Sequence, residues 1–322
     1  MALLFLLTSW NSQALAGKNN RGVNNRSDAI ILLPSAVVNF ARPNLLYGTD
    51  ENAGPFGVWD PSKGFFTQST HPALYELNFP TTGADGLYFD LDIEGVDASE
   101  LIWEPVTHEG ITATVEWKHV TAAMWMDGPE EVTRVTLTGP KIDDYDLAMH
   151  PYPNVVHKPH LPQTFELVGK DREGNEVVTY GFVLQKWFLV REDVTMEDEE
   201  APNYAVWHAM WCNVFGYRLP KVKDLTNAVC LDYDHDPDNY ECNGAVGATP
   251  SSSGNYYQRQ IGAGLFSEWG KIYYYFGAKF GDDDYPTSDA TDSIPFFSVA
   301  SFDGQVLAGD PPRLYDGVCV TP

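Results

Sequence analysis

The stretch Tyr204–Gly216 reads YAVWHAMWCNVFG and decides how the C-terminal third of the chain folds. Its large apolar side chains recur at i, i+3, i+4 and i+7, the spacing of one helix face: Trp207, Met210, Trp211 and Val214. Gly216 is expected to end this helix, and Pro220 to open a second one that reaches Leu225. Three aromatic-rich runs beyond it predict strands, at Trp269–Phe276, Pro295–Phe302 and Tyr315–Thr321.

All four cysteines lie in this third of the chain, at Cys212, Cys230, Cys242 and Cys319. An even number confined to one segment of an exported chain implies disulfide bonds, and four cysteines allow three pairings. Cys230 and Cys242 flank a short acidic loop, so we expect a bridge between them. Cys212 would then pair with Cys319 and tie the start of the domain to its end. Metal ligation is the alternative, and the lack of a C-x-x-C pair argues against it.

The middle of the chain alternates polar and apolar residues, as half-buried strands do. Such runs are Leu87–Ile93, Ile111–Lys118, Glu131–Thr138, Thr164–Val168 and Val177–Leu189. Short strands joined by Gly, Pro and Asn turns predict a β-sandwich of the immunoglobulin type. Because no cysteine precedes Cys212, we expect Trp103 or Trp117 to fill the core where antibody domains have a disulfide.

The first residues resemble an export signal. Ala2–Leu7 is a short apolar run, and Ala14–Ala16 fits the small-x-small rule for signal peptidase, with a buried strand as the alternative. Arg191–Pro202 is acidic and poor in apolar residues, as linkers are. The predicted organisation is a signal peptide at 1–16, a flexible leader at 17–28, an Ig-like β-sandwich region at 29–194 with room for a small extra subdomain at its start, a linker at 195–202 and a C-terminal domain at 203–322.

The charge balance narrows the range of partners. Twenty basic and 45 acidic side chains give the 322 residues a formal net charge of −25. Nucleic-acid binding needs a cationic face, and an anionic membrane repels such a chain, so neither partner is expected. No run approaches about 18 apolar residues, so we expect no direct membrane insertion.

Trp211–Pro220, WCNVFGYRLP, followed by Asp224–Ala228, resembles the W/Y-C-x-x-x-G-x-R-L-P-x-x-x-E-L motif of intimin- and invasin-type bacterial adhesins. That motif opens the C-type-lectin-like tip of these proteins. Leu265–Gly270 resembles a central strand of the tip, Phe302–Val306 and Gly317–Val320 its last two strands, and Phe79–Gly86 and Lys186–Phe188 parts of the preceding Ig-like domain. The resemblance implies a mainly β chain with an α+β C-terminal part: an Ig-like β-sandwich followed by a C-type-lectin-like domain.

The same resemblance implies a function. It indicates a secreted or surface-associated, virulence-type adhesin, exported through the periplasm, that recognises a protein receptor or envelope protein through its C-type-lectin-like domain. Family members are long and anchored by an outer-membrane barrel, whereas this chain is expected to be a stand-alone secreted member. The alternative is a periplasmic or envelope accessory protein that works with an intimin-like barrel and contacts no host.

One acidic loop is a candidate calcium site. Asp232, Asp234, Asp236 and Asp238 stand at alternate positions, where their carboxylates can converge on a hard cation such as Ca²⁺. The EF-hand spacing fails because Pro237 replaces the turn glycine. The alternative, a solvated acidic hairpin, is the one we favour, and no other cofactor is expected. The Glu-Pro-Asn and Gln-Pro-Asp triplets of sugar-binding lectins are missing, which argues against sugar recognition.

A second acidic loop is a candidate for partner binding. Asp282, Asp283 and Asp284 would steer basic partners, and Tyr285 beside them is a typical interface anchor. The alternative is an ordinary solvated loop.

Chemistry at other sites finds little support in the sequence. His150, His157 and His160 could ligate zinc, but a proline-stiffened loop with solvated imidazoles is the simpler interpretation. G-x-S-x-G, H-E-x-x-H and phosphate-loop motifs are absent, so no catalytic residue is assigned and an enzyme is not expected.

Overall fold

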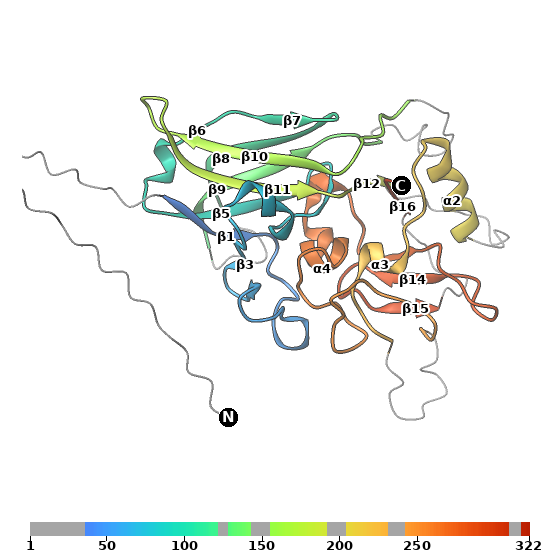
Figure 1. Cartoon of the computed structure of the whole chain (residues 1–322). Coiled ribbons are helices and arrows are strands. Elements are labelled where there is room, and N and C mark those ends of the chain that lie inside the picture. Colours follow the sequence, from blue (N-terminus) through green and yellow to red (C-terminus); the bar gives the residue numbers. More distant parts are fainter. Residues whose placement is uncertain (1–35, 122–127, 143–154, 192–203, 231–241, 309–316) are drawn as a thin grey trace, which may run out of the picture. The chain divides into compact units, whose positions relative to one another are not determined.

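The computed structural model describes residues 36–121, 128–142, 155–191, 204–230, 242–308 and 317–322. A seven-stranded sheet faces a three-stranded sheet in the N-terminal part (Figure 1). In spatial order the larger sheet contains β2 (Trp59–Asp60), β3 (Gly64–Phe66), β1 (Val37–Arg42), β5 (Tyr88–Glu94), β9 (Glu130–Thr138), β8 (Ile111–Val120) and β7 (Val106–His108). The smaller one contains β11 (Glu176–Leu184), β10 (Gln163–Lys170) and β6 (Ile102–Trp103). Four of the five strands predicted from alternation are confirmed; the fifth, Val177–Leu189, is divided at Gln185 into β11 and β12 (Lys186–Arg191), which belong to different sheets.

Alternation along β8 and β9 explains how the sandwich closes. The two strands pair from Thr112 opposite Thr138 to Val120 opposite Glu130. Every second side chain therefore points between the sheets, and Ala113 and Leu137 are fully buried there. The tryptophan prediction was wrong: Trp117 is 44% exposed, because it lies beyond the cover of the opposite sheet, and Trp103 is only half-buried. Trp187, which is fully buried, fills the core instead.

A third sheet joins the two halves of the chain. Strand β12 (Lys186–Arg191) pairs in parallel with β4 (Thr82–Ala84) and antiparallel with β16 (Gly317–Val320), the last strand of the chain. The disulfide Cys212–Cys319 ties β16 to the first helix of the C-terminal part, and a second disulfide joins Cys230 to Cys242. Both predicted pairings are confirmed.

The C-terminal part combines short helices with a small antiparallel sheet. Its helices are α2 (Tyr204–Val214), α3 (Val222–Leu225) and α4 (Leu265–Trp269), and its sheet contains β13 (Asp284–Pro286), β14 (Phe297–Ala300) and β15 (Val306–Ala308). Both predicted helices and two of the three predicted strands are confirmed.

Short 3₁₀ turns occur in both parts of the chain. They are η1 (Asp50–Asn52), η2 (Pro72–Leu77), η3 (Ala98–Glu100), η5 (Ile272–Tyr274) and η6 (Phe276–Ala278).

Two predictions about these elements were wrong. The family strand expected at Leu265–Gly270 is helix α4. The strand expected at Trp269–Phe276 is replaced by the end of α4 and the 3₁₀ turn η5. The buried face of α2 is also rotated from the predicted one: Met210 is 64% exposed, whereas His208 and Trp211 are buried. Contact with β16 on one side sets that face.

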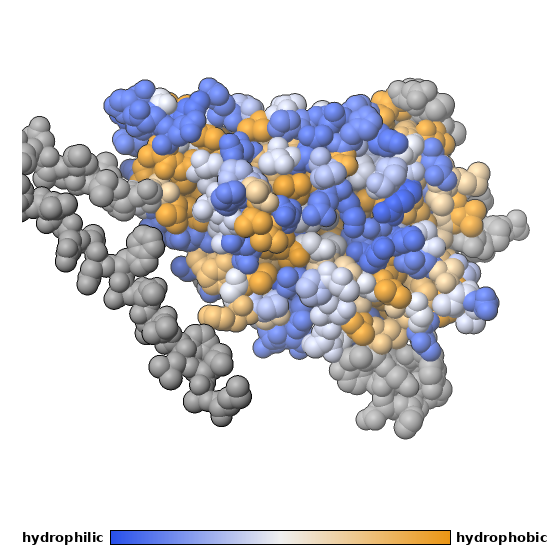
Figure 2. All heavy atoms as spheres, viewed as in Figure 1, coloured by the Kyte–Doolittle hydropathy of each residue, from blue (hydrophilic) through white to orange (hydrophobic). Residues whose placement is uncertain are grey.

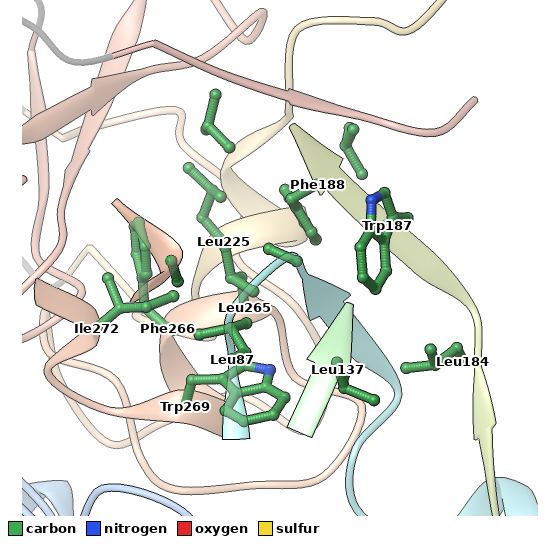
Figure 3. Packing of buried hydrophobic residues seen from close by; sticks show 14 of the residues in the cluster. Leu87, Leu137, Leu184, Trp187, Phe188, Leu225, Leu265, Phe266, Trp269 and Ile272 are labelled. Carbon is green, nitrogen blue, oxygen red and sulfur yellow. The ribbon is translucent and has the colours of Figure 1, made fainter. Parts of the chain in front are cut away.

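The core is continuous from the sandwich into the C-terminal part. Figure 3 shows Leu265 and Trp269 of α4 beside Leu87 and Leu137 of the sandwich, with Trp187 of β12 nearby. Residues Ser35–Pro322 accordingly form one compact unit. This continuity gives no support to separate folding of the two halves. The boundaries drawn at 1–16, 17–28 and 195–202 lie outside the described residues and stay predictions.

The observed class is mainly β with an α+β C-terminal part, as predicted. Among the helices that the described residues form, none combines the length and apolar character needed to cross a membrane.

Candidate functional site

The segment Lys271–Phe280, KIYYYFGAKF, has a period of three because it forms the successive 3₁₀ turns η5 and η6. Side chains three positions apart are eclipsed, so one column is buried: Ile272, Tyr275 and Ala278. A second column faces outward. In it Phe276 is 74% exposed and Tyr273 is 39% exposed.

Tyr275 fixes the segment to the N-terminal part. Its hydroxyl accepts a hydrogen bond of 2.6 Å from the backbone N–H of Asn44. The Asn44 side chain donates in turn to the carbonyl of Lys271, at 2.8 Å. The Tyr275 ring lies edge-on to those of Tyr88 and Trp269. Burial raises the pKa of the Tyr275 hydroxyl well above its usual value, so it stays a neutral hydrogen-bonding group.

Backbone contact brings the second turn equally close. Gly86 has a φ of +82°, and a Cβ there would lie 2.3 Å from the carbonyl oxygen of Gly277. A side chain at Gly86 would therefore push η6 away from the sandwich. The outward column is thus held on a rigid base.

Five aromatic rings meet on this base and form what we call the aromatic patch. Its members come from three distant parts of the chain: Tyr47, Tyr273, Tyr274, Phe276 and Phe302. Three of them, Tyr47, Tyr274 and Phe302, lie around the ammonium group of Lys271. On the face drawn in Figure 2, hydrophobic residues lie in small groups between hydrophilic ones, as is ordinary for protein surfaces. The patch differs from scattered exposed residues because its rings contact one another within two groups, Tyr47 with Phe302, and Tyr273 with Tyr274 and Phe276.

Lys271 links the rings of the patch electrostatically. Its Nζ lies 5.4 Å from the ring centroid of Tyr274, 5.6 Å from that of Tyr47 and 5.9 Å from that of Phe302. These distances are within the range of cation–π attraction. The same Nζ lies 3.4 Å from a carboxylate oxygen of Asp282, which connects the patch to the acidic loop.

A buried carboxyl lies next to the patch. Asp303 is 6% exposed, and burial, together with the nearby charge of Asp284, raises its pKa to about 6. The backbone N–H of Gln305, which donates to Asp303, and the ammonium of Lys271 offset part of that rise. Ionisation of Asp303 at neutral pH therefore lowers the stability of the folded protein.

Helix α4, just before the segment Lys271–Phe280, makes a second contact with the N-terminal part. Glu268 of α4 is fully buried, and its carboxylate accepts hydrogen bonds from both the backbone N–H and the hydroxyl of Thr81 and of Thr82. The N–H of Gly262 donates a fifth, at 2.8 Å. Burial raises the pKa of Glu268, and these five donors oppose that rise. We call this contact the junction.

Asp224 of α3 completes the junction. Its carboxylate accepts from Arg218 at 2.6 Å and from the N–H of Lys221 at 2.8 Å, and Lys186 of β12 lies 2.8 Å away. Burial alone would raise the pKa of Asp224, but Arg218 and Lys186 overcome it and hold the pKa at about 2. In the motif quoted above, Asp224 occupies the acidic position, so its role here is structural.

The four residues predicted to bind a partner differ in their exposure to solvent. Asp282 and Asp283 are exposed and Asp284 is half-buried. Tyr285 was expected to be an interface anchor, but it is fully buried against Phe266. Tyr285 belongs to β13 and lies opposite Val299 of β14. Its ring is buried in the core of the C-terminal part and cannot reach a partner.

The candidate metal sites are only partly covered. Asp232, Asp234, Asp236 and Asp238 lie outside the described residues, and so does His150. His160 and His157 contact Glu109, at 2.9 and 3.9 Å. Within the part of the chain that the structure describes, no group of three or more His, Cys, Asp or Glu residues could hold a metal ion.

The aromatic patch was missed because its signal is not local. Tyr47 and Phe302 carry no pattern that relates them to residue 271. The run KIYYYFGAKF is rich in residues that favour strands, so its composition hid the period of three. The one clue in the sequence was that aromatic residues recur three positions apart, as Tyr273 and Phe276 do.

No protein-family model and no curated protein matches the chain. Among solved structures, the chain is similar to invasin, a bacterial integrin-binding protein, at 14% identity with a TM-score of 0.42, over 77% of this chain and 36% of that one. It is also similar to a C-terminal 282-residue fragment of intimin in complex with the intimin-binding domain of the translocated intimin receptor, at 10% identity and a TM-score of 0.41, over 89% and 66%. An intimin mutant from EHEC O157:H7 shows 10% identity and a TM-score of 0.35, over 82% and 92%.

These three structures are of invasin- and intimin-type proteins, the kind that the sequence motifs resemble. The chain spans only about a third of the invasin chain, 36% of its length. The identities are below 25% and the TM-scores below 0.5, so these likenesses do not indicate a function.

Proposed function

We propose that this chain is a binding protein of the adhesin type, secreted or held at the cell surface, which recognises a protein partner through the aromatic patch. The observation that carries the proposal is the outward column of η5 and η6. Phe276 is 74% exposed and its ring contacts those of Tyr273 and Tyr274, and contiguous exposed apolar groups of this kind mark interaction sites, whereas singly exposed ones do not. No catalytic group is part of the proposal.

The composition of the patch suits a protein interface. Tyrosine and other large aromatics carry much of the binding energy at interfaces, because they bury a large area and lose few rotamers. The patch rests on the anchored base described above, so little ordering is needed on binding. Rigid turns and exposed rings together favour recognition of a folded surface.

The acidic loop indicates the charge of the partner. Asp282 and Asp283 are exposed beside Lys271, and the whole chain has a net charge of −25. A surface of this sign accelerates encounter with a basic partner and repels an acidic one. We therefore infer a partner that presents apolar groups ringed by Lys or Arg. Its binding should weaken as salt rises.

The test measures binding of the labelled, oxidised full chain to cultured epithelial cells and to bacterial outer-membrane vesicles. The double variant Tyr273→Ser/Phe276→Ser should bind at least about tenfold more weakly, a typical loss for interface anchors. Phe56→Ser is the matched control, since Phe56 is fully exposed and makes no ring contact with the patch among the described residues. Wild-type binding by the double variant would contradict the proposal.

Comparing binding to epithelial cells with binding to outer-membrane vesicles distinguishes a role in host contact from a role in the bacterial envelope. Patch-dependent binding to cells alone supports an adhesin. Patch-dependent binding to vesicles alone indicates the accessory role beside an outer-membrane barrel, and would overturn host contact.

A further inference from the structure

The seven-stranded sheet divides between two of its central strands. Strands β5 and β9 pair from Tyr88 opposite Thr136 as far as Leu91 opposite Thr133. Beyond that rung β5 continues along β1, with Glu94 opposite Val37, while β9 stays with β8. Among the residues that the structure describes, the segments 92–94 and 130–132 therefore each have a ladder partner on one side only (β1, β5, β8 and β9 in Figure 1). We call this opening the fork.

A cavity of about 530 Å³ fills the fork. Residues of both separated segments line it, among them Asp92, Ile93, Glu130, Glu131 and Val132. A volume of this size is typical of a ligand site. Backbone N–H and C=O groups that lack a ladder partner are a template for another strand.

The last rungs before the fork are fixed by charge. Arg134 of β9 binds Asp90 of β5 through two hydrogen bonds, of 2.7 and 3.0 Å. Within the fork, Arg42 of β1 binds Glu130 of β9 at 2.6 Å, so this ion pair reaches across β5 and one face of the opening. These contacts hold the opening at one place in the sheet, so the fork has a defined position.

The two walls of the fork differ in chemistry. The pleat places Leu91, Ile93 and Trp117 on the sandwich side, and Trp117 is 44% exposed there. On the other side lie Asp92 and Lys63. In all, four acidic and two basic side chains line the cavity, so its charge is negative: Asp90, Asp92, Glu130, Glu131, Arg42 and Lys63.

We propose that the fork binds an extended peptide segment of a partner protein, inserted as a strand between β5 and β9. Strand addition supplies affinity through the backbone, and the pockets on alternate sides supply specificity. Because a strand alternates its side chains, the segment that fits has apolar residues toward Trp117 and Lys or Arg toward Asp92. This site is separate from the aromatic patch and does not depend on the function proposed for it.

Synthetic peptides test the proposal with the full chain. The probe is an acetylated, amidated hexapeptide of alternating valine and lysine, titrated by calorimetry. Binding should slow hydrogen exchange of the amides at 92–94 and 130–132. Two further peptides carry methyl groups on the valine amides or on the lysine amides, and each therefore blocks one backbone edge. An inserted strand pairs on both edges, so both methylated peptides should bind at least about tenfold more weakly.

Matched variants locate the site. Trp117→Ala and Asp92→Lys should each weaken the probe about tenfold, whereas Phe56→Ala and Glu176→Lys, at exposed positions elsewhere, should not. An alternating valine–glutamate peptide should not bind. Equal binding by either methylated peptide, binding indifferent to Trp117→Ala, or no binding of the probe would each overturn the proposal.

Discussion

Two buried aspartates show how differently the junction and the aromatic patch are built. Asp224, at the junction, has partners for both oxygens and a pKa of about 2. Asp303, beside the patch, is buried near Asp284 and has a pKa of about 6. Both start from the same usual value of 3.8. Their surroundings alone move them in opposite directions.

The difference separates a region selected for stability from one that costs stability. At the junction, every carboxylate oxygen of Glu268 and Asp224 has a hydrogen-bond donor or an ion-pair partner. At the patch, aromatic rings stay exposed and a carboxyl is ionised against its preference. Binding sites commonly carry such costs, because partner binding recovers them. Changes at the junction should therefore affect folding, and changes at the patch should affect binding.

The largest effect is expected from removing the sandwich. A fragment 203–322 lacks β4 and β12, so β16 loses the strand it pairs with and Trp269 loses its cover. We expect this fragment to be recovered unfolded or aggregated, with no near-ultraviolet circular dichroism. The full chain, oxidised in parallel, is the control. A folded, monomeric fragment would show that the junction is a surface contact rather than shared core.

Glu268→Ala should be next in size. It leaves the buried donors of Thr81, Thr82 and Gly262 without an acceptor, which we expect to cost about 3–5 kcal/mol of unfolding free energy. Glu268→Gln keeps one acceptor oxygen and should lose less. Urea unfolding of the two variants checks the order. Equal losses would contradict this order and mean that the single acceptor oxygen of glutamine preserves none of the stabilisation, because glutamine leaves no cavity.

Asp303→Asn should stabilise the protein at neutral pH. The folded-state pKa of about 6 lies above the usual 3.8, so protonation of Asp303 stabilises the fold below pH 4 and that contribution disappears as pH rises through 6. The wild type should therefore gain about 2–3 kcal/mol between pH 7 and pH 4 from this group. The variant should lack that gain. Parallel pH profiles of the two proteins would contradict the assignment.

Asp224→Asn should show the opposite profile with a smaller amplitude. The folded-state pKa of about 2 lies below 3.8, so the ionised form stabilises the fold above pH 4 and the contribution is lost as pH falls toward 2. We expect a loss of about 2 kcal/mol at pH 7 and convergence with the wild type in acid. Denaturant titrations from pH 2 to pH 7 measure it. A constant difference across that range would count against an ion pair.

Local patterns predicted the local elements and failed where distant residues meet. Helix α2, the alternating strands and both disulfides were visible because each leaves a short-range spacing or a small set of pairings. The contact between Glu268 and Thr81 joins residues 187 positions apart, and nothing in either neighbourhood indicates the other. Tyr285 shows the same limit, because acidic neighbours made it look exposed while the pairing of β13 buries it.

The measurement that tests the account most directly determines stability and binding of Tyr273→Ser/Phe276→Ser on one sample. The two side chains are exposed, so the unfolding free energy should stay within about 0.5 kcal/mol of the wild type for each substitution. Binding to cells or vesicles should fall at least about tenfold in the same preparation. A variant that unfolds more easily and binds normally would show that the aromatic patch serves folding, which is the opposite of the role proposed here.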